Sequence, residues 1–451
     1  MNVGNFSVSN WIFAGGRSLP VHELSSSAPT PVFAGLRGHF ALDLQADGAH
    51  LLARDPLGVN KLFFAAGDGW LESSNFFIDL VRRGHAPERI WSVPSGHVLR
   101  AWPNERRLSL EKYSTLSFDD ETKDLESVLP AHADRIRTAL SATFRELRAA
   151  LPESTPLYVT LSGGLDSTTI AALAREHLGR FTAVTFVARD PGVGDDPDSD
   201  LHYARLVAES FGIPLEVIEI TPDALLERLD EVLVYGQDFR DFNVHCGLVN
   251  AVLARAIAER ERARTPGGGS NGGPSAVRPC VLTGDTMNEL VADYTPVQYG
   301  ASEYYSLPNL SRGRLRRFLV SGLDSGDREV GIYARHGIDV LQPYAIRPDV
   351  YTALPGNFLE DDDAKQRLAR LVMGERVPAA IYSRKKVRAQ VAGSEKVGGT
   401  MKALLDRGVD GAALQRRFCE LMGFDAPELK RWMRAGVYRF PSSYPEVREN
   451  E

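Results

Sequence analysis

The residues with the clearest chemical meaning are TLSGGLDSTT at positions 160–169. They follow the short apolar run Leu157, Tyr158 and Val159, and they precede a helix-like run that starts at Ile170. A strand that enters a glycine-rich turn at a helix N-terminus directs backbone N–H groups and the positive end of the helix dipole at an anion. The stretch therefore predicts a phosphate-binding loop, although Ser-Gly-Gly is also common in ordinary turns.

The side chains of this loop suit a nucleotide. Glycines let the backbone approach a phosphate, hydroxyl groups donate to it, and the carboxylate of Asp166 can hold a Mg²⁺ that bridges phosphates. The loop lacks the G-x-x-x-x-G-K-[ST] pattern of a Walker A loop. The ATP contacts expected here are Leu161, Ser162, Gly163, Gly164, Asp166 and Ser167.

The sequence changes character near residue 125. Before it, short apolar runs alternate with turn signals such as GDG at 67–69 and PSG at 94–96, which is typical of short strands. After it, amphipathic runs alternate with apolar stretches at 157–161, 181–187, 215–220 and 281–283, which predicts a parallel sheet covered on both faces. We expect a β-rich domain over 1–125 and an α/β domain over 126–451.

Composition narrows the class of protein. The chain has 451 residues, is 43% hydrophobic and 25% charged, and carries a net charge of −7, so nothing indicates nucleic-acid binding. Three cysteines without metal-ligand spacing favour a reducing compartment. No signal peptide or membrane-length apolar run is visible. We expect a soluble cytoplasmic protein without membrane partners, and a homodimer stays open. The Gly/Ser-rich run at 265–275 indicates a surface insertion, or alternatively a lid.

Several stretches resemble known families. SGGLDS at 162–167 resembles the pyrophosphate loop of ATP pyrophosphatases, which cut ATP between the α and β phosphates. GHFALD at 38–43 and RDPLGVNKLFF at 54–64 resemble the N-terminal domain of class B asparagine synthetases, and LTGDTMNEL at 282–290 takes the place of that family's second phosphate-side motif. The resemblance implies an Ntn-hydrolase-like αββα sandwich, then an adenine-nucleotide α-hydrolase-like (ATP pyrophosphatase) domain.

The N-terminus departs from that family. A glutamine-dependent member needs a cysteine directly after the initiator methionine, because its free amine is the base and its thiol the nucleophile. This chain has Asn2 there, and its first cysteine is Cys246. We therefore expect a degenerate glutaminase domain that does not hydrolyse glutamine.

A lost glutaminase is typical of the β-lactam synthetase and carbapenam synthetase branch, whose members adenylate a carboxylate and close a ring with an amine of the same substrate. IYSRKKV at 381–387, followed by AGS at 392–394, resembles the lysine-bearing segment of that branch, with Lys386 at the matching place. The resemblance implies that Lys386 stabilises negative charge on the pyrophosphate and the tetrahedral intermediate. A solvated basic loop is the alternative.

The second motif supplies the remaining acids. The ring-closing enzymes have a tyrosine where this chain has Asp285, and their second Mg²⁺ ligand falls on Asn288, beside Glu289. An amide is a weaker Mg²⁺ ligand than a carboxylate, so we expect Glu289 or Asp285 to supply the negative charge. The expected metal set is Asp166, Asn288 and Glu289. The glutamate of that branch's catalytic dyad falls near Glu329. Asp285 and Glu329 are the expected general base, with a surface role for Glu329 as the alternative.

Together these residues predict an AMP- and pyrophosphate-forming ligase that uses ATP and Mg²⁺. It would adenylate a small amino-carboxylate and form an amide, by ring closure within one substrate, in specialised-metabolite (antibiotic) biosynthesis. An intermolecular amide ligase or an ammonia-dependent asparagine synthetase is the alternative, and a scaffold that binds nucleotide without catalysis is a third reading. A substrate pocket could be lined by the aromatic cluster of Tyr299, Tyr304 and Tyr305. Packing in the core is the alternative for these three side chains. Further ATP contacts are expected at Val184, Thr185, Phe186 and Gly284.

Overall fold

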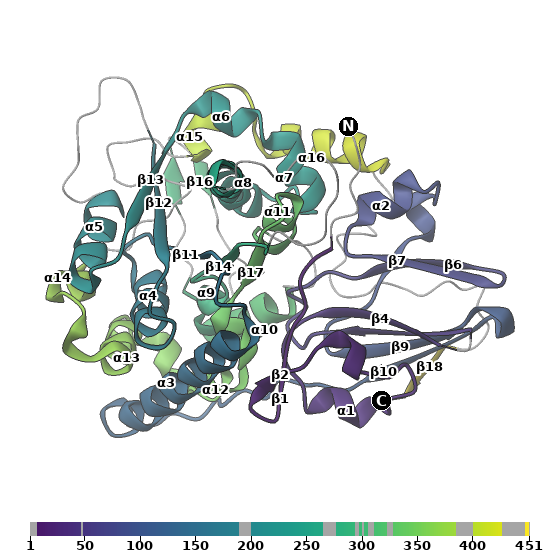
Figure 1. The fold of residues 1–451 in the computed structure, drawn as a ribbon, viewed down its shortest axis with the longest axis horizontal. Helices are drawn as coiled ribbons and strands as arrows, with labels where there is room; N and C mark the ends of the chain where they lie inside the picture. The colour runs from purple at the N-terminus through teal and green to yellow at the C-terminus, as the bar shows by residue number, and fades with distance from the viewer. Residues whose placement is uncertain are drawn as a thin grey trace.

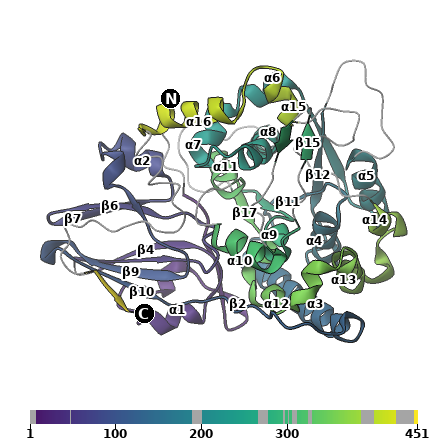
Figure 2. The same cartoon turned by 180° about the vertical axis from the view of Figure 1, so that it is seen from behind.

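The computed structural model describes residues 7–46, 48–188, 200–264, 277–293, 297–299, 302–304, 311–322, 328–384, 400–425 and 447–450. Its ribbon has a β-rich half and an α/β half, and both halves are visible from the front and from behind (Figures 1 and 2). Within the described ranges, no helix is both long and apolar enough to cross a bilayer.

The β-rich half holds three small sheets, of which one has five strands and two have three. Its strands alternate as a half-buried sheet requires: along β10, Leu108 and Leu110 are buried while Ser109 and Glu111 are partly exposed. The sheet orders are β2-β1-β3, β18-β10-β9-β5-β4 and β7-β6-β8. The strands are β1 (Trp11–Ala14), β2 (Arg17–Ser18), β3 (Arg37–His39), β4 (Ala41–Ala46), β5 (Ala49–Arg54), β6 (Phe63–Gly67), β7 (Trp70–Ser74), β8 (Trp91–Ser92), β9 (His97–Trp102), β10 (Arg107–Lys112) and β18 (Val447–Asn450).

This half has the layer order that the resemblance implies. In Figure 1 the short helix α2 (Phe77–Arg82) lies above the sheet of β6 and β7, and α1 (Thr30–Ala34) lies below the sheet of β4, β9 and β10. Both helices are only about a turn and a half long.

The α/β half is built on a five-stranded parallel sheet in the order β13-β12-β11-β14-β17. Its strands are β11 (Leu157–Thr160), β12 (Thr182–Ala188), β13 (Leu215–Ile220), β14 (Cys280–Leu282) and β17 (Asp339–Leu341). The predicted parallel sheet is confirmed, and the four predicted strands lie within one residue of β11, β12, β13 and β14. All of β14 is buried, as expected for a strand covered on both faces.

Helices cover both faces of this sheet. On one side lie α4 and α5, backed by the long α3 and by α13; on the other lies α8, packed against α7 and α11. The helices are α3 (Leu125–Ala150), α4 (Leu165–His177), α5 (Asp200–Phe211), α6 (Pro222–Leu226), α7 (Leu229–Tyr235), α8 (Asp241–Arg264), α9 (Met287–Val291), α10 (Arg312–Gly322), α11 (Val330–Arg335), α12 (Asp349–Thr352), α13 (Ala364–Met373), α14 (Ala379–Ser383), α15 (Thr400–Leu405) and α16 (Gly411–Met422). A short hairpin joins β15 (Val297–Tyr299) and β16 (Ser302–Tyr304).

The two halves share one apolar core. The largest buried cluster runs from Trp11 and Phe76 through the parallel sheet to Phe418. Helix α3 begins at the predicted boundary near residue 125, where the Asp124 carboxylate caps its N-terminus. The division into two domains stays a prediction, because the core does not break at that point.

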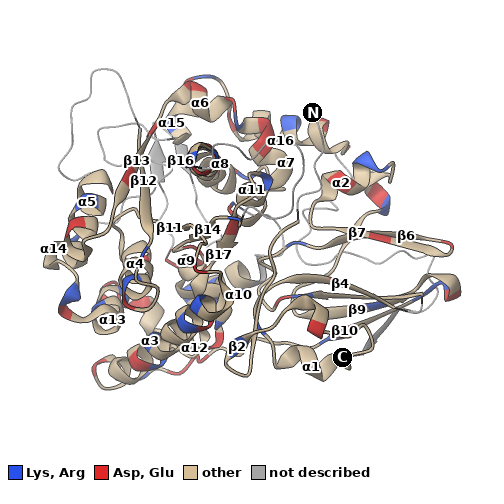
Figure 3. Ribbon diagram, in the orientation of Figure 1, with Lys and Arg blue, Asp and Glu red and all other residues tan. Residues whose placement is uncertain are grey.

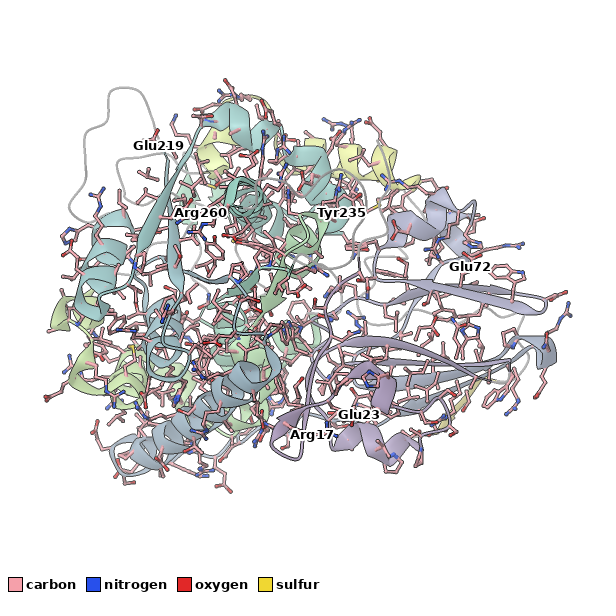
Figure 4. The ribbon with its side chains drawn as sticks, in the orientation of Figure 1. Arg17, Glu23, Glu72, Glu219, Tyr235 and Arg260 are labelled. Atoms are coloured by element: carbon pink, nitrogen blue, oxygen red, sulfur yellow. The ribbon has the colours of Figure 1, made fainter. Side chains whose placement is uncertain are left out.

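Charged residues of both signs are interspersed along the helices and strands of both halves (Figure 3). Many form surface ion pairs of the kind that contribute little to stability. One is the pair of Arg17 in β2 and Glu23, both labelled in Figure 4.

Candidate active site

A cavity of about 600 Å³ opens at the carboxyl ends of the parallel strands. Because β12 and β13 lie on one side of β11 while β14 and β17 lie on the other, the chain reverses its direction across the sheet between β11 and β14. Ligands of open α/β sheets bind at such a switch point. The loops after β11 and β14 line the cavity there, and one side of α8 and the segments around α13 and α14 complete its walls.

The loop between β11 and α4 has the form of a phosphate cradle. Its two serines brace it from within: Ser162 N–H donates to Ser167 Oγ at 3.2 Å, and Gly164 N–H donates to Ser162 Oγ at 3.3 Å. No side chain caps the N-terminus of α4 at Gly164. The first turn of α4 therefore faces the cavity with the N–H groups that bind an anion.

Gly163 serves a purpose that the sequence did not indicate. Its φ of +70° is in the left-handed region, and a Cβ there would lie 2.4 Å from Tyr203 Cβ and 2.6 Å from the Tyr203 carbonyl carbon. Gly163 is absent from the cavity lining, whereas Gly164 is part of it. The first glycine thus allows α5 to pack closely on the loop, and the second borders the space for a ligand.

Lys365, at the start of α13, places its ammonium group among three side-chain oxygens, of which one belongs to Asp166 of the cradle. Its Nζ lies 2.9 Å from Asp166 Oδ2, 3.1 Å from Asn288 Oδ1 and 2.6 Å from Asp293 Oδ2. Burial alone would lower the pKa of Lys365, but the charges of Asp166 and Asp293 outweigh it and raise the pKa above its ordinary value. The ammonium is therefore charged at neutral pH.

The three expected metal ligands do not meet at one centre. Asp166 and Asn288 both accept hydrogen bonds from Lys365, while the Glu289 carboxylate pairs with Arg328. Nowhere in the described ranges do three His, Cys, Asp or Glu residues form a group able to hold a metal ion. The oxygens around Lys365 thus bind an ammonium rather than form a metal site of their own, and the predicted Mg²⁺ that bridges the phosphates of ATP stays a prediction.

A second basic residue, Arg384, contacts the loop between β11 and α4. Arg384, just after α14, donates to the Ser162 carbonyl at 2.8 Å and pairs with the buried carboxylate of Asp200. Its guanidinium also lies over the Tyr203 ring, 4.5 Å from the ring centre. Lys386 follows two residues later and lies outside the described residues, so its predicted role stays a prediction.

Beyond β14, two acids of the second motif share one arginine. Arg328 donates to both oxygens of Asp285, at 2.6 and 2.8 Å, and also to the Glu289 carboxylate. Burial raises the pKa of Asp285, although the charge of Arg328 opposes the change. Asp285 and Arg328 line the cavity, whereas Glu289 is buried behind them.

Glu329 lies beside this group, with its side chain almost fully buried. Its Oε2 accepts from Thr283 Oγ1 at 2.6 Å and from Gln342 Nε2 at 2.9 Å. Burial and, next, the charge of Asp285 raise the pKa of Glu329 well above its ordinary value. Asp285 and Glu329 therefore lie close enough for their charges to interact, and both residues line the cavity.

The turn between Asp285 and α9 has a strained backbone. Thr286 has a φ of 79°, which is rare for a β-branched residue and costs of order 1–3 kcal/mol. Its hydroxyl donates to Gln342 Oε1 at 2.7 Å, and its backbone N–H donates to the Asp285 carboxylate. The strained turn thus fixes Asp285 and Gln342 together at the edge of the cavity.

Most of the predicted ATP contacts border the cavity. Gly284 brings the second motif against the cradle: a Cβ there would lie 2.9 Å from the Ser167 nitrogen. Residues 184–186 of β12 line the cavity together with Val249 and Leu253 of α8, so this part of its wall is largely apolar and suits a flat base. The predicted contacts on the lining are Leu161, Ser162, Gly164, Asp166, Ser167, Val184, Thr185, Phe186 and Gly284.

Several residues of the lining were not predicted from the sequence. Lys365 belongs to no motif, and Arg328 stands out only as one residue in a charged run. Both are found through contacts far apart in the sequence, since Lys365 and Asp166 are 199 positions apart. The side chains of Tyr299, Tyr304 and Tyr305 and the run at 265–275 lie outside the described residues, so those predictions stay open.

Comparison with known proteins finds similarity to asparagine synthases over part of the chain. Residues 145–320 match the family model described as asparagine synthase. The amidase chry2 of Gibberella zeae is 27% identical over 285 residues, which cover 54% of this chain and 41% of that protein. Asparagine synthetase [glutamine-hydrolyzing] 2 of Arabidopsis thaliana is 25% identical over 240 residues, covering 49% and 37%. The chain spans about two fifths of the length of these relatives.

Among solved structures, NMN synthetase from Francisella tularensis covers 69% of this chain and 92% of that chain, with 14% identity and a TM-score of 0.29. The NH(3)-dependent NAD(+) synthetase of Rhizobium meliloti is 37% identical over 107 residues, which cover 24% of this chain and 29% of that protein. Residues 145–320 are therefore similar to the asparagine synthase domain, of a family that uses ATP to form amides.

Proposed function

We propose that this protein is an ATP-dependent, AMP- and pyrophosphate-forming ligase. It adenylates the carboxylate of a small amino-carboxylate and forms an amide by ring closure with the amine of the same substrate, in specialised-metabolite biosynthesis in the cytoplasm. One observation carries the proposal: a single cavity joins the phosphate cradle at Ser162–Ser167 to the paired acids Asp285 and Glu329. A nucleotide and an acyl acceptor can therefore meet in one cavity.

The first step uses the cradle. The N-terminus of α4 binds the phosphates, and the ammonium of Lys365 meets their negative charge. The adenine lies against residues 184–186. A substrate carboxylate oxygen then bonds to the α-phosphorus, and the bond between that phosphorus and the pyrophosphate oxygen breaks. The products are an acyl-adenylate and pyrophosphate, and Lys386 is proposed to stabilise the charge that develops.

The second step uses the acids. The amine nitrogen bonds to the acyl carbon and must give up a proton, and the bond from that carbon to AMP breaks. Glu329 is the proposed acceptor of the proton, and its carboxylate is held toward the cavity by Thr283 and Gln342. Asp285 is bound on both oxygens by Arg328, so we assign it to orientation and charge rather than to proton transfer.

A second candidate is an intermolecular ligase, including an ammonia-dependent asparagine synthetase. The relatives that are named asparagine synthetases favour it. The two candidates differ in what the second step needs. Ring closure releases AMP from one substrate, whereas an intermolecular ligase needs an added amine.

The test is ATP–pyrophosphate exchange across a panel of amino-carboxylates, with AMP and product mass measured in parallel. We expect a substrate that alone yields AMP and a product lighter by one water. Glu329→Gln should keep exchange and lose amide formation. Glu146→Gln is the matched control, because Glu146 is equally buried but pairs with Arg37 away from the cavity. Loss of exchange in Glu329→Gln, or unchanged product formation, would overturn the assignment of the base.

A further inference from the structure

The β-rich half contacts the open edge of the parallel sheet. Strand β17 pairs with β14 on one side only, and its other edge faces the N-terminal half (Figure 1). Trp11 Nε1 donates to the Val340 carbonyl at 2.7 Å, and Ser9 Oγ donates to the Asp339 carboxylate. An uncovered strand edge leaves polar backbone groups unpaired, and the bond from Trp11 satisfies one of them.

The next residue of that edge is bound through a histidine. The backbone N–H of Gln342 donates to His39 Nε2 at 3.3 Å, and His39 Nδ1 lies 2.9 Å from Asn60 Oδ1. Asn60 Nδ2 donates to the Ser9 carbonyl at 3.0 Å, which fixes the amide with its oxygen toward His39. His39 must therefore carry its proton on Nδ1 and accept at Nε2. Burial lowers its pKa to about 4, so it is neutral at physiological pH.

The loop that carries Asn60 is held by buried hydrogen bonds from Asp55 and Arg54. The Asp55 carboxylate accepts the backbone N–H groups of Leu57, Val59 and Asn60. The buried guanidinium of Arg54 donates to the carbonyls of Asn60, Gly58 and Val93. The loop is thus a rigid support for Asn60 rather than an open ligand site.

Gln342 connects this support to the proposed base. Its backbone is held by His39, while its side chain donates to Glu329 Oε2 at 2.9 Å and accepts from Thr286 Oγ1 at 2.7 Å. A line of hydrogen-bonded residues therefore links the two halves of the protein. Asn60 bonds to His39, His39 bonds to the backbone of Gln342, and the side chain of Gln342 bonds to Glu329.

We propose that His39 and Asn60 are positioning residues, through which the β-rich half holds Gln342 and the Glu329 carboxylate in place for amide formation. This inference rests on the proposed function for its kinetic consequence. The β-rich half then has a task in this enzyme that is independent of glutamine hydrolysis.

The test compares two variants that each remove one hydrogen bond to the same strand edge. His39→Leu breaks the line to Glu329, whereas Trp11→Phe removes the bond to Val340 and leaves the line intact. We expect His39→Leu to slow amide formation from the acyl-adenylate at least tenfold, with exchange unchanged, because small displacements of a reacting group are costly. His39→Gln, whose amide can both donate and accept, should recover part of the rate. Trp11→Phe should leave the rate of amide formation unchanged relative to the rate of exchange.

A second readout is independent of any substrate. Carbon-13 NMR of labelled glutamate, assigned with Glu329→Gln, follows the titration of the Glu329 carboxyl. We expect its titration to move in His39→Leu and to stay unchanged in Trp11→Phe. Equal effects of the two variants on titration, or a titration unchanged in His39→Leu, would overturn the positioning role. Failure of exchange in the wild-type protein would instead overturn the proposed function alone.

Discussion

Lys365→Met tests whether an ammonium, rather than a resident metal ion, serves the phosphate cradle. Methionine matches lysine in length but has no charge. The substitution removes the partner that lies 2.9 Å from Asp166 Oδ2 and 2.6 Å from Asp293 Oδ2. Two carboxylates and the Asn288 amide then face one another across the space that the ammonium held.

The cost of this change follows from the burial of the stranded groups. Removing one partner of a fully buried ion pair costs about 3–5 kcal/mol. The side chains of Asp166 and Asp293 keep 20% and 26% of their exposure, so water screens part of their repulsion. We expect a loss of about 2 kcal/mol in the free energy of unfolding. Lys402→Met is the control, since Lys402 pairs with Asp406 on an exposed helix face, where ion pairs contribute about 0.3–0.5 kcal/mol.

The assay measures Mn²⁺ binding by electron paramagnetic resonance without nucleotide, alongside urea unfolding. We expect no tight site in the wild-type protein and a new site in Lys365→Met, where added Mn²⁺ restores part of the lost stability. Tight Mn²⁺ binding by the wild-type protein without nucleotide would refute the reasoning. So would a Lys365→Met protein that neither loses stability nor gains a metal ion.

Two further expectations concern neighbouring parts of the site. Gly163→Ala should lose about 3 kcal/mol of stability by urea unfolding, because its left-handed φ costs about 1–2 kcal/mol and its Cβ would overlap the Tyr203 backbone. Gly164→Ala, with φ −78° and only Ser162 Oγ at 3.3 Å, should change stability by less than about 1 kcal/mol, and equal losses would contradict the account. Because the folded state raises the pKa of Glu329, it holds that proton more tightly than the unfolded chain does. Stability should therefore fall as pH rises from the ordinary glutamate pKa toward the raised one, by about 1.4 kcal/mol per pH unit. Glu329→Gln should lose this dependence in urea titrations across pH, and an unchanged slope would contradict it.

The local pattern of the sequence was sufficient for the parallel sheet and the cradle. Strand, glycine turn and helix are adjacent in the chain at 157–177, so periodicity and turn chemistry locate them. Local pattern did not predict a role for Asp285 and Glu329. They were identified only through the resemblance to the ring-closing enzymes. Lys365 was not predicted because its role depends on α13 packing against α4, a contact that no local pattern records.

Gly163 shows a different limit of sequence reasoning. The spacing in SGGLDS assigns both glycines to phosphate approach, and only the packed position of α5 separates their tasks. The metal set is a related case. Asp166, Asn288 and Glu289 are suitable ligand types, but the positions of Lys365 and Arg328 divide them between two cations.

The charges around the proposed base suggest how Glu329 becomes able to accept a proton in the proposed second step. Asp285, Glu289 and Glu329 surround a single arginine, so the group would carry excess negative charge if all three acids were ionised. Burial and, next, the charge of Asp285 raise the pKa of Glu329, which favours its protonated form. A substrate ammonium that enters the cavity adds a positive charge beside these acids and lowers the pKa of Glu329. The carboxylate then becomes available as a base when the amine is in place. Substrate binding thereby prepares the proton acceptor that the second step requires.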